Sequence, residues 1–209
     1  MKGKRSYAEG CAAAHALDLV GERWALLVVR ELIFGPKRFT DLRASLPLIS
    51  PNVLTQRLTD LERAGVLRRH KLPRPAAAWV YELTPWGAGL EPILMSLGRW
   101  ALHSPAFPEG KPMSADALML SLRTMFSAPA DFAATIELRV DDDAFTAAIA
   151  DGRLSLTRGT TPAPDATITA DTTTLASLVY GGASLRASGA KVTGDGRAAR
   201  GFLRAFASA

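Results

Sequence analysis

The stretch Ile49-Ser50-Pro51-Asn52-Val53-Leu54-Thr55-Gln56-Arg57-Leu58 decides the fold of the first half of this chain. Ser50 is a good N-cap residue, and Pro51 suits the first helical position, where its missing N–H has no intrahelical partner to lose. The apolar spacing predicts a helix that continues to about Ala64 and ends at Gly65.

This helix is expected to have one apolar face and one face of amides and hydroxyls. At about 100° per residue, Leu54, Leu58 and Leu61 fall on one side and predict contact with a core. The opposite side carries Asn52, Thr55, Gln56, Thr59 and Arg63. Amides and hydroxyls donate and accept hydrogen bonds, as reading base edges in the major groove of DNA requires. An ordinary polar surface is the alternative interpretation.

The segments before and after this helix predict a winged helix-turn-helix. A helical pattern runs from Gly21 to Phe34, and a short helix is expected from Arg38 to Ser45. Residues 66–70 and 79–83 alternate like two strands, joined by the basic, proline-stiffened connector 71–78. In such a fold the second helix enters the major groove, and the hairpin reaches the flanking backbone or the minor groove.

The charge of the chain is concentrated on these elements. The whole chain has 25 Lys and Arg against 20 Asp and Glu, a net charge of +5, whereas residues 35–75 alone hold nine basic and three acidic residues, a net of +6. A localised basic segment indicates a polyanionic partner, here double-stranded DNA. Arg57 borders the apolar face, so it can instead pair with an acidic neighbour. The residues expected to contact bases or phosphates are Lys37, Arg38, Ser50, Asn52, Thr55, Gln56, Arg57, Thr59, Arg69, Lys71 and Arg74.

A wide apolar stripe predicts a dimer contact in the next helix. Thr84-Pro85 repeats the cap-plus-proline start, the helix is expected over residues 86–102, and Pro92 is expected to kink it. Helix-turn-helix proteins generally bind paired half-sites as two-fold dimers. Domain core is the alternative role for the stripe. The candidate dimer residues are Trp86, Leu90, Leu94, Leu97 and Trp100.

A segment rich in proline divides the chain. Residues 103–112 contain three Pro and one Gly, which no helix or central strand accommodates. We therefore expect a DNA-binding domain over residues 1–104, a linker over 105–113 and a second domain over 114–209.

The second half predicts an α+β layout, with an antiparallel sheet covered by helices. All three histidines precede the linker, so this domain has no histidine for a catalytic triad or a zinc site, and we expect no enzyme activity, catalytic residue, metal or cofactor. The expected helices are 115–127, 172–180 and 197–207, and the expected strands are 135–140, 144–150, 153–157, 166–170 and 190–193.

Other features suggest a cytoplasmic protein. No apolar run approaches the roughly 18–20 residues that span a bilayer, so a membrane is not an expected partner. The basic N-terminus is not followed by the apolar core of a signal peptide. Cys11 is the single cysteine, which excludes an internal disulfide.

Residues 11–102 resemble the HxlR-type winged helix family, relatives of the MarR regulators. This resemblance implies a dimeric bacterial transcription regulator with its recognition helix at residues 50–64 and its wing at 69–78. The blocks that carry it are residues 21–24, 35–42, 49–58, 61–65 and 81–87.

Two positions depart from the family pattern. Many members have a Cys-Pro pair before the first helix, and some sense oxidants or electrophiles through that cysteine, whereas here Cys11 precedes Ala12. A redox role for Cys11 therefore stands beside its interpretation as a small buried hydrophobic residue. The wing usually has an arginine just before its second strand, where this chain has Ala76-Ala77-Ala78, with Arg74 further back.

Residues 114–207 resemble a sterol-carrier-protein-like domain, on the blocks 151–156, 165–171, 175–181 and 192–195. This resemblance implies an apolar cavity that holds a hydrophobic effector. Methionines suit an adaptable lining, and plain core is the alternative role. The candidate lining residues are Met119, Leu122, Met125 and Phe126.

The leading hypothesis is therefore a dimeric, sequence-specific DNA-binding transcription regulator whose second domain binds a hydrophobic effector or supports assembly. The alternative is a carrier or sensor of small hydrophobic molecules whose basic half docks to a protein partner.

Overall fold

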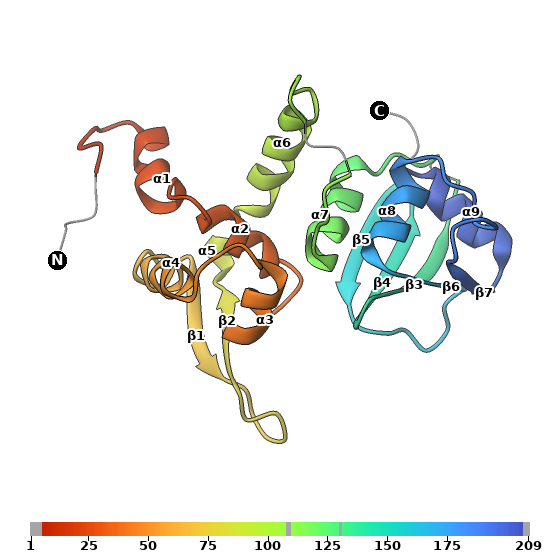
Figure 1. Ribbon diagram of the computed structural model, residues 1–209, viewed down its shortest axis with the longest axis horizontal. Helices are drawn as coiled ribbons and strands as arrows, with labels where there is room; N and C mark the ends of the chain where they lie inside the picture. The colour runs from red at the N-terminus through yellow and green to blue at the C-terminus, as the bar shows by residue number, and fades with distance from the viewer. Residues whose placement is uncertain (1–5, 108–109, 130, 207–209) are drawn as a thin grey trace. The chain divides into compact units, whose positions relative to one another are not determined.

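The computed structural model describes residues 6–107, 110–129 and 131–206. The chain divides into two compact units, the first ending at Leu94 and the second beginning at Met95 (Figure 1). This division falls within helix α6 (Glu91–Leu102), ahead of the proline-rich segment 105–113, of which residues 108 and 109 lie outside the described residues. Within the described part of the chain, no helix is long and apolar enough to cross a membrane.

The first unit has the predicted order of helix, turn, helix and hairpin. Ser50 Oγ accepts a hydrogen bond from Val53 N at 3.3 Å and caps the helix that follows it. The leucines of that helix, Leu54, Leu58 and Leu61, are buried in the core as expected. The elements are α1 (Ala12–Val20), α2 (Ala25–Glu31), α3 (Phe39–Ser45), α4 (Pro51–Arg63), β1 (Leu67–Lys71), β2 (Trp79–Leu83) and α5 (Pro85–Ala88).

Two predicted helices have different bounds in the structure. The segment Gly21–Phe34 is not one helix, because Gly21 caps the unpredicted α1 and Trp24 takes a left-handed conformation with φ 78° before α2 begins. Residues 86–102 are not one kinked helix, because α5 ends at Ala88 and α6 begins at Glu91. Pro92 thus lies in the first turn of a new helix, where a proline is well tolerated.

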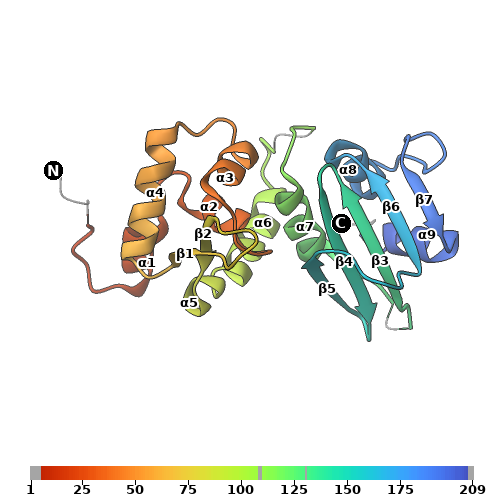
Figure 2. The same cartoon turned by 90° about the horizontal axis from the view of Figure 1, so that it is seen from below.

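The second unit is a five-stranded sheet with helices packed against it (Figure 2). Helix α9 contacts β3 and β6, α7 contacts β5, and α8 lies between α7 and α9. The large buried side chains Leu118, Phe145 and Phe202 belong to its core. The elements are α7 (Ala115–Met125), β3 (Ala134–Val140), β4 (Asp143–Ala150), β5 (Arg153–Arg158), β6 (Ala166–Ala170), α8 (Thr172–Tyr180), β7 (Lys191–Gly194) and α9 (Gly196–Arg204).

The expectation of an antiparallel sheet is wrong for one strand pair. The strand order is β5-β4-β3-β6-β7, and β6 pairs with β3 in parallel, whereas the other neighbours are antiparallel. The reason is that β6 does not form a hairpin with β5, the strand before it. After residues 159–165, β6 pairs on the side of β3 that β4 leaves open, where it runs in the same direction as β3.

Gly87 allows the start of α5 to lie against the end of the α4–β1 connection. Thr84 N donates to Val66 O at 3.0 Å, and Thr84 Oγ1 accepts from Gly87 N at 3.0 Å. A Cβ atom on Gly87 would lie 1.9 Å from Val66 O. Any side chain at this position would therefore push two backbone segments apart.

We expect Gly87→Ala to destabilise the first unit by about 3 kcal/mol, because the clash is with backbone and cannot be relieved by a side-chain rotation. Gly10→Ala is the matched control, since a Cβ on Gly10 meets nothing within 4 Å. Urea unfolding followed by tryptophan fluorescence measures both. Equal unfolding midpoints for the two variants would contradict the packing described here.

Candidate nucleic-acid interface

The outer face of α4 presents polar groups that are held in defined positions. Asn52, Thr55 and Gln56 are exposed, and Thr59 is half-buried. Thr55 Oγ1 donates to Pro51 O at 2.9 Å, and Thr59 Oγ1 donates to Thr55 O at 3.0 Å. Because both hydroxyl hydrogens are engaged by the helix, these threonines offer an acceptor oxygen and a methyl group to a partner.

The side chain of Gln56 is oriented by a neighbour on the same helix. Its Nε2 donates to Asp60 Oδ1 at 2.9 Å, one turn further along. A glutamine amide that reads a base must present its donor and its acceptor together in one plane. Asp60 therefore restricts the rotation of the group that the sequence identifies as the main candidate for base contact.

Two exposed apolar side chains near the start of α4 are not indicated by the sequence pattern. Leu48 is 86% exposed in the turn before Ser50, and Val53 is 38% exposed in the first turn of α4. Apolar contact with a thymine methyl group is one means of reading DNA. The available signal was that Val53 lies off the leucine face of the helix. Leu48 belongs to no periodic pattern, so only its exposure identifies it.

The hairpin that forms the wing is tied to α4. Arg69 N donates to Glu62 Oε1 at 3.1 Å, which links β1 to the last turn of α4. The Arg69 guanidinium lies 4.6 Å from the ring centre of Trp79 on β2. Lys71 and Arg74 are exposed toward the tip, and Figure 1 shows the hairpin projecting away from the helices.

Lys37 does not belong to the exposed basic surface, contrary to the expectation of a phosphate contact. It is only 8% exposed, and its Nζ lies 3.0 Å from Glu31 Oε2 and 3.2 Å from Ser45 Oγ. Glu31 is fully buried, so Lys37 neutralises a charge inside the unit. The main chain of Lys37 also pairs with Tyr81 of β2.

Arg57 takes the alternative role that the sequence left open. Its guanidinium nitrogens lie 3.4 Å from Glu22 Oε2 and 3.5 Å from Asp60 Oδ2, and its side chain is largely buried. Arg38, by contrast, is exposed at the start of α3, where its N–H donates to Asp41 Oδ2 at 3.0 Å. The exposed cations among the predicted DNA contacts are thus Arg38, Arg69, Lys71 and Arg74.

The candidate dimer residues lie on helices with large exposed apolar side chains. No residue of α6 is buried, and Trp100 is 76% exposed. Trp86 and Leu97 are also exposed, whereas Leu90 and Leu94 pack partly against the core of the first unit.

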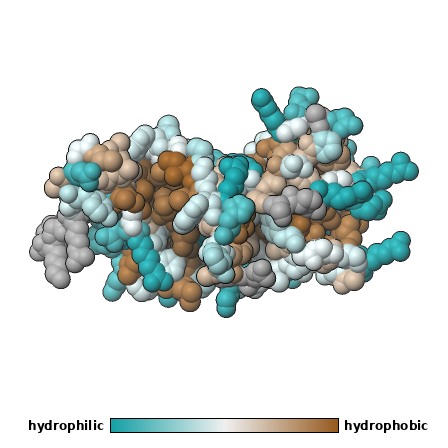
Figure 3. All heavy atoms as spheres, turned by 90° about the horizontal axis from the view of Figure 1, so that it is seen from above, coloured by the Kyte–Doolittle hydropathy of each residue, from teal (hydrophilic) through white to brown (hydrophobic). Residues whose placement is uncertain are grey.

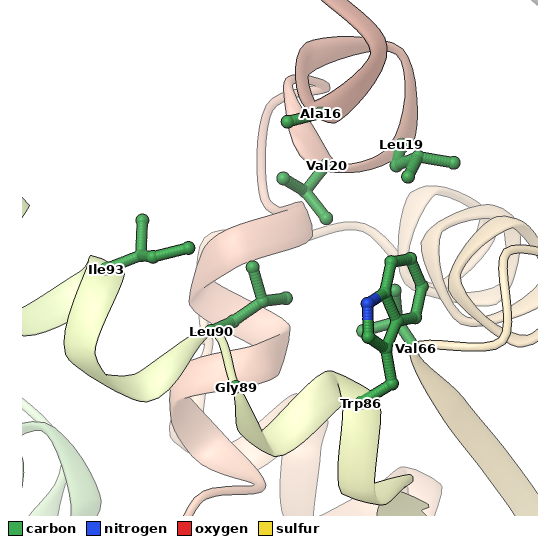
Figure 4. Close-up of a pocket in the computed structure, with 8 residues that line it drawn as sticks. All are labelled: Ala16, Leu19, Val20, Val66, Trp86, Gly89, Leu90 and Ile93. Carbon is green, nitrogen blue, oxygen red and sulfur yellow. The ribbon is translucent and has the colours of Figure 1, made fainter. Parts of the chain in front are cut away.

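An apolar pocket of about 240 Å³ lies in the first unit between α1 and the segment from α5 to the start of α6. Brown hydrophobic side chains gather beside α1 in Figure 3, and Figure 4 shows Trp86 and Leu90 directed into the pocket. The lining residues are Ala16, Leu19, Val20, Val66, Trp86, Gly89, Leu90 and Ile93.

The candidate redox residue and the candidate effector-lining residues differ in their exposure. Cys11 is exposed at the N-cap of α1, which excludes the buried role, and the N–H groups of Ala14 and Ala13 lower the pKa of its thiol. Met119 and Leu122 are fully buried in the core of the second unit. Met125 and Phe126 are half-buried, and the Phe126 ring packs against Phe206 with centroids 5.8 Å apart.

Comparison with known proteins finds that the first half of this chain is similar to helix-turn-helix regulators. Residues 19–105 match the family described as HxlR-like helix-turn-helix. The chain is 40% identical over 86 residues to the HTH-type transcriptional regulator YvaP of Bacillus subtilis. The matched residues cover 41% of this chain and 80% of YvaP. It is 35% identical over 86 residues to the regulator YodB of the same organism, covering 41% of this chain and 77% of YodB.

A solved structure is also similar. The reduced form of YodB from B. subtilis aligns with a TM-score of 0.43 and 30% identity, covering 48% of this chain and all of that one.

We expect Lys37→Ala to lower the free energy of unfolding of the first unit by about 2 kcal/mol, because the buried Glu31 carboxylate loses its ammonium partner and keeps Arg30. Lys71→Ala is the matched control on the wing and should change stability by less than about 0.5 kcal/mol. Urea unfolding measures both variants. A Lys37→Ala protein that unfolds like the parent but loses affinity for duplex DNA would show that Lys37 contacts phosphate after all.

Proposed function

We propose a function from the premise that the chain belongs to the HxlR-like helix-turn-helix family. In this proposal the protein is a transcription regulator that reads a specific duplex sequence through α4 and binds it as a homodimer. The observation that carries this proposal is the polar outer face of α4 beside a basic wing in the same unit. The Glu62–Arg69 hydrogen bond joins these two elements, so they approach DNA as one surface.

Base recognition is assigned to the outer face of α4. Gln56 and Asn52 supply the amides suited to adenine, and Thr55 and Thr59 supply acceptor oxygens. Leu48 and Val53 flank them and suit contact with thymine methyl groups. Ser50, at the N-cap, lies where the first turn of the helix approaches the DNA backbone.

Phosphate contacts are assigned to the exposed cations Arg38, Arg69, Lys71 and Arg74. Lys37 and Arg57 are engaged inside the unit, so the number of contacts falls from the six suggested by the sequence to four in each protomer. Each phosphate neutralised contributes about −0.9 to the slope of log affinity against log salt concentration. A dimer with eight such contacts should therefore show a slope of about −7.

We expect duplex binding to show this salt dependence, and we expect Lys71 and Gln56 to affect it differently. A binding site selected from random duplexes is titrated by fluorescence anisotropy between low and moderate KCl. Lys71→Ala should weaken all sequences alike and make the slope shallower by about 1 per protomer. Gln56→Ala should leave the slope unchanged and reduce the preference for the selected site by about tenfold, or 1.4 kcal/mol.

Two outcomes would contradict the assignment. A slope near zero would exclude DNA as the partner of the basic surface and favour the alternative, a carrier or sensor whose basic half docks to a protein. An unchanged sequence preference in Gln56→Ala would show that another face of the unit reads the bases.

The homodimer is assigned to the apolar side chains of the segment from α5 to α6, of which Trp86, Leu97 and Trp100 are exposed and Leu90 and Leu94 are half-buried. We expect Trp100→Glu to raise the dissociation constant of the dimer at least about tenfold, because it places a charge where an aromatic ring is buried on association. Sedimentation velocity measures this. Leu48→Glu is the matched control, since Leu48 is equally exposed but lies in the turn before α4. A parent protein that sediments as a monomer, or an unaffected Trp100→Glu variant, would refute this interface.

The second unit is assigned the binding of an effector or support of assembly. Met119 and Leu122 are fully buried in its core, so this part of α7 supplies packing, and an effector would have to displace well-packed side chains to reach it.

A further inference from the structure

The second unit separates its charges, although its total is neutral. Residues 182–206 hold five basic residues and one acidic residue, a net of +4. In Figure 1 this segment lies at the edge of the sheet formed by β7, with α9 beside it, and hydrophilic side chains project from that end in Figure 3. The basic residues are Arg186, Lys191, Arg197, Arg200 and Arg204, and the acidic one is Asp195.

These cations differ from Arg139 and Arg158 of the same unit in having no carboxylate partner. Arg139 pairs with Glu137 at 2.7 Å, and Arg158 pairs with Asp116 at 2.5 Å and also with Asp143. Within the described residues, none of the five cations in 182–206 forms a salt bridge. Like charges gathered without counter-charges repel one another and attract anions from solution.

Two of the five line an open pocket of about 300 Å³. Arg186 lies in the loop before β7, and Arg200 lies on α9. The pocket wall between them is apolar and consists of Leu185, Ala190 and Val192. Two arginines and a hydrophobic surface therefore line one small volume.

Two glycines keep this pocket open. The Arg200 guanidinium folds back over the start of α9, where its Nη1 would lie 3.3 Å from a Cβ on Gly196. Gly194 has φ +85°, and a Cβ there would lie 2.5 Å from Asp165 O, so only glycine fits. Both glycines line the pocket and add no side chain to it.

The acidic residue of this segment caps α9 and is not among the residues that line the pocket. Asp195 Oδ1 accepts a hydrogen bond from Arg197 N at 2.7 Å and so caps α9. No carboxylate is among the residues that line the pocket. The charge offered to a ligand is therefore positive.

We propose that this pocket binds a small carboxylate with an apolar body. The carboxylate lies between the guanidinium groups of Arg186 and Arg200, which are suited to bidentate hydrogen bonds with planar anions. The apolar body lies against Leu185, Ala190 and Val192. This deepens the proposed function by naming the chemical class of the effector. Ligand binding itself does not depend on DNA binding, and only its regulatory consequence rests on that function.

A small amphipathic anion fits these observations better than the DNA backbone does. A phosphodiester chain needs cations along an open surface and has no group for an apolar wall. The pocket combines its cations with that wall in a concave site, which is typical of small-molecule sites.

Isothermal titration of the full chain tests the proposal with three probes. Octanoate carries both features, octan-1-ol carries the apolar body alone, and acetate carries the anion alone. We expect octanoate to bind at least tenfold more tightly than either of the others. Arg186→Gln and Arg200→Gln should each weaken octanoate binding at least tenfold.

Arg153→Gln is the matched control, because Arg153 is an exposed arginine on β5, at the opposite edge of the sheet. It should leave octanoate binding unchanged. Thermal unfolding of each variant confirms that an altered affinity does not come from an unfolded unit.

Three results would overturn the proposal: octan-1-ol binding as tightly as octanoate, unchanged octanoate binding in both pocket variants, or an equal loss in Arg153→Gln. If octanoate does not bind and the two variants instead weaken duplex DNA and reduce its salt dependence, the cations form a second DNA contact. The outcome for the proposed function is separate. If octanoate binds and duplex DNA does not, the carboxylate pocket is supported and the proposed DNA-binding function is refuted. If duplex DNA binds with a steep salt dependence and octanoate does not, the DNA-binding function is supported and the carboxylate pocket is refuted.

Discussion

The buried ion pair between Glu31 and Lys37 is the interaction on which the first unit depends. Glu31 ends α2 and is fully buried, and its carboxylate is neutralised by Lys37 at 3.0 Å and by Arg30 at 2.8 Å. Lys37 also reaches Ser45 at the end of α3, while its main chain pairs with Tyr81 of β2. A buried charge without a partner is strongly unfavourable, so α2, α3 and the wing strand are held in one arrangement.

The polar outer surface of α4 follows from this arrangement. With α2 and α3 in place, the leucines of α4 fill the core, and the amides and hydroxyls of the same helix must point outward. The charge count of the sequence describes this surface only in part. Lys37, Arg57 and Arg68 all belong to the basic segment, yet each is paired with a carboxylate of the same unit. Net charge identifies a polyanion-binding segment, whereas the pairing of each side chain decides which cations can reach phosphate.

The second unit shows the same difference between a total and its distribution. Residues 111–209 hold ten acidic and ten basic residues, so their net charge is zero. In the fold, the carboxylates of β3, α7 and β4 are matched by Arg139 and Arg158, while the cations near β7 and α9 gather around a pocket. A regulator built in this way would read DNA with one unit and respond to an amphipathic anion with the other.

Features that depend on neighbouring residues were determined by the sequence alone. The Ser50-Pro51 start of α4, its apolar face and the adjacent strands β4 and β5 each rest on caps, turns or periodicity within a few residues. Tertiary structure alone decided the burial of Lys37, the exposure of Cys11 and the parallel pairing of β6 with β3. These three depend on contacts between segments far apart in the chain, and no local pattern encodes which distant segment will supply the partner.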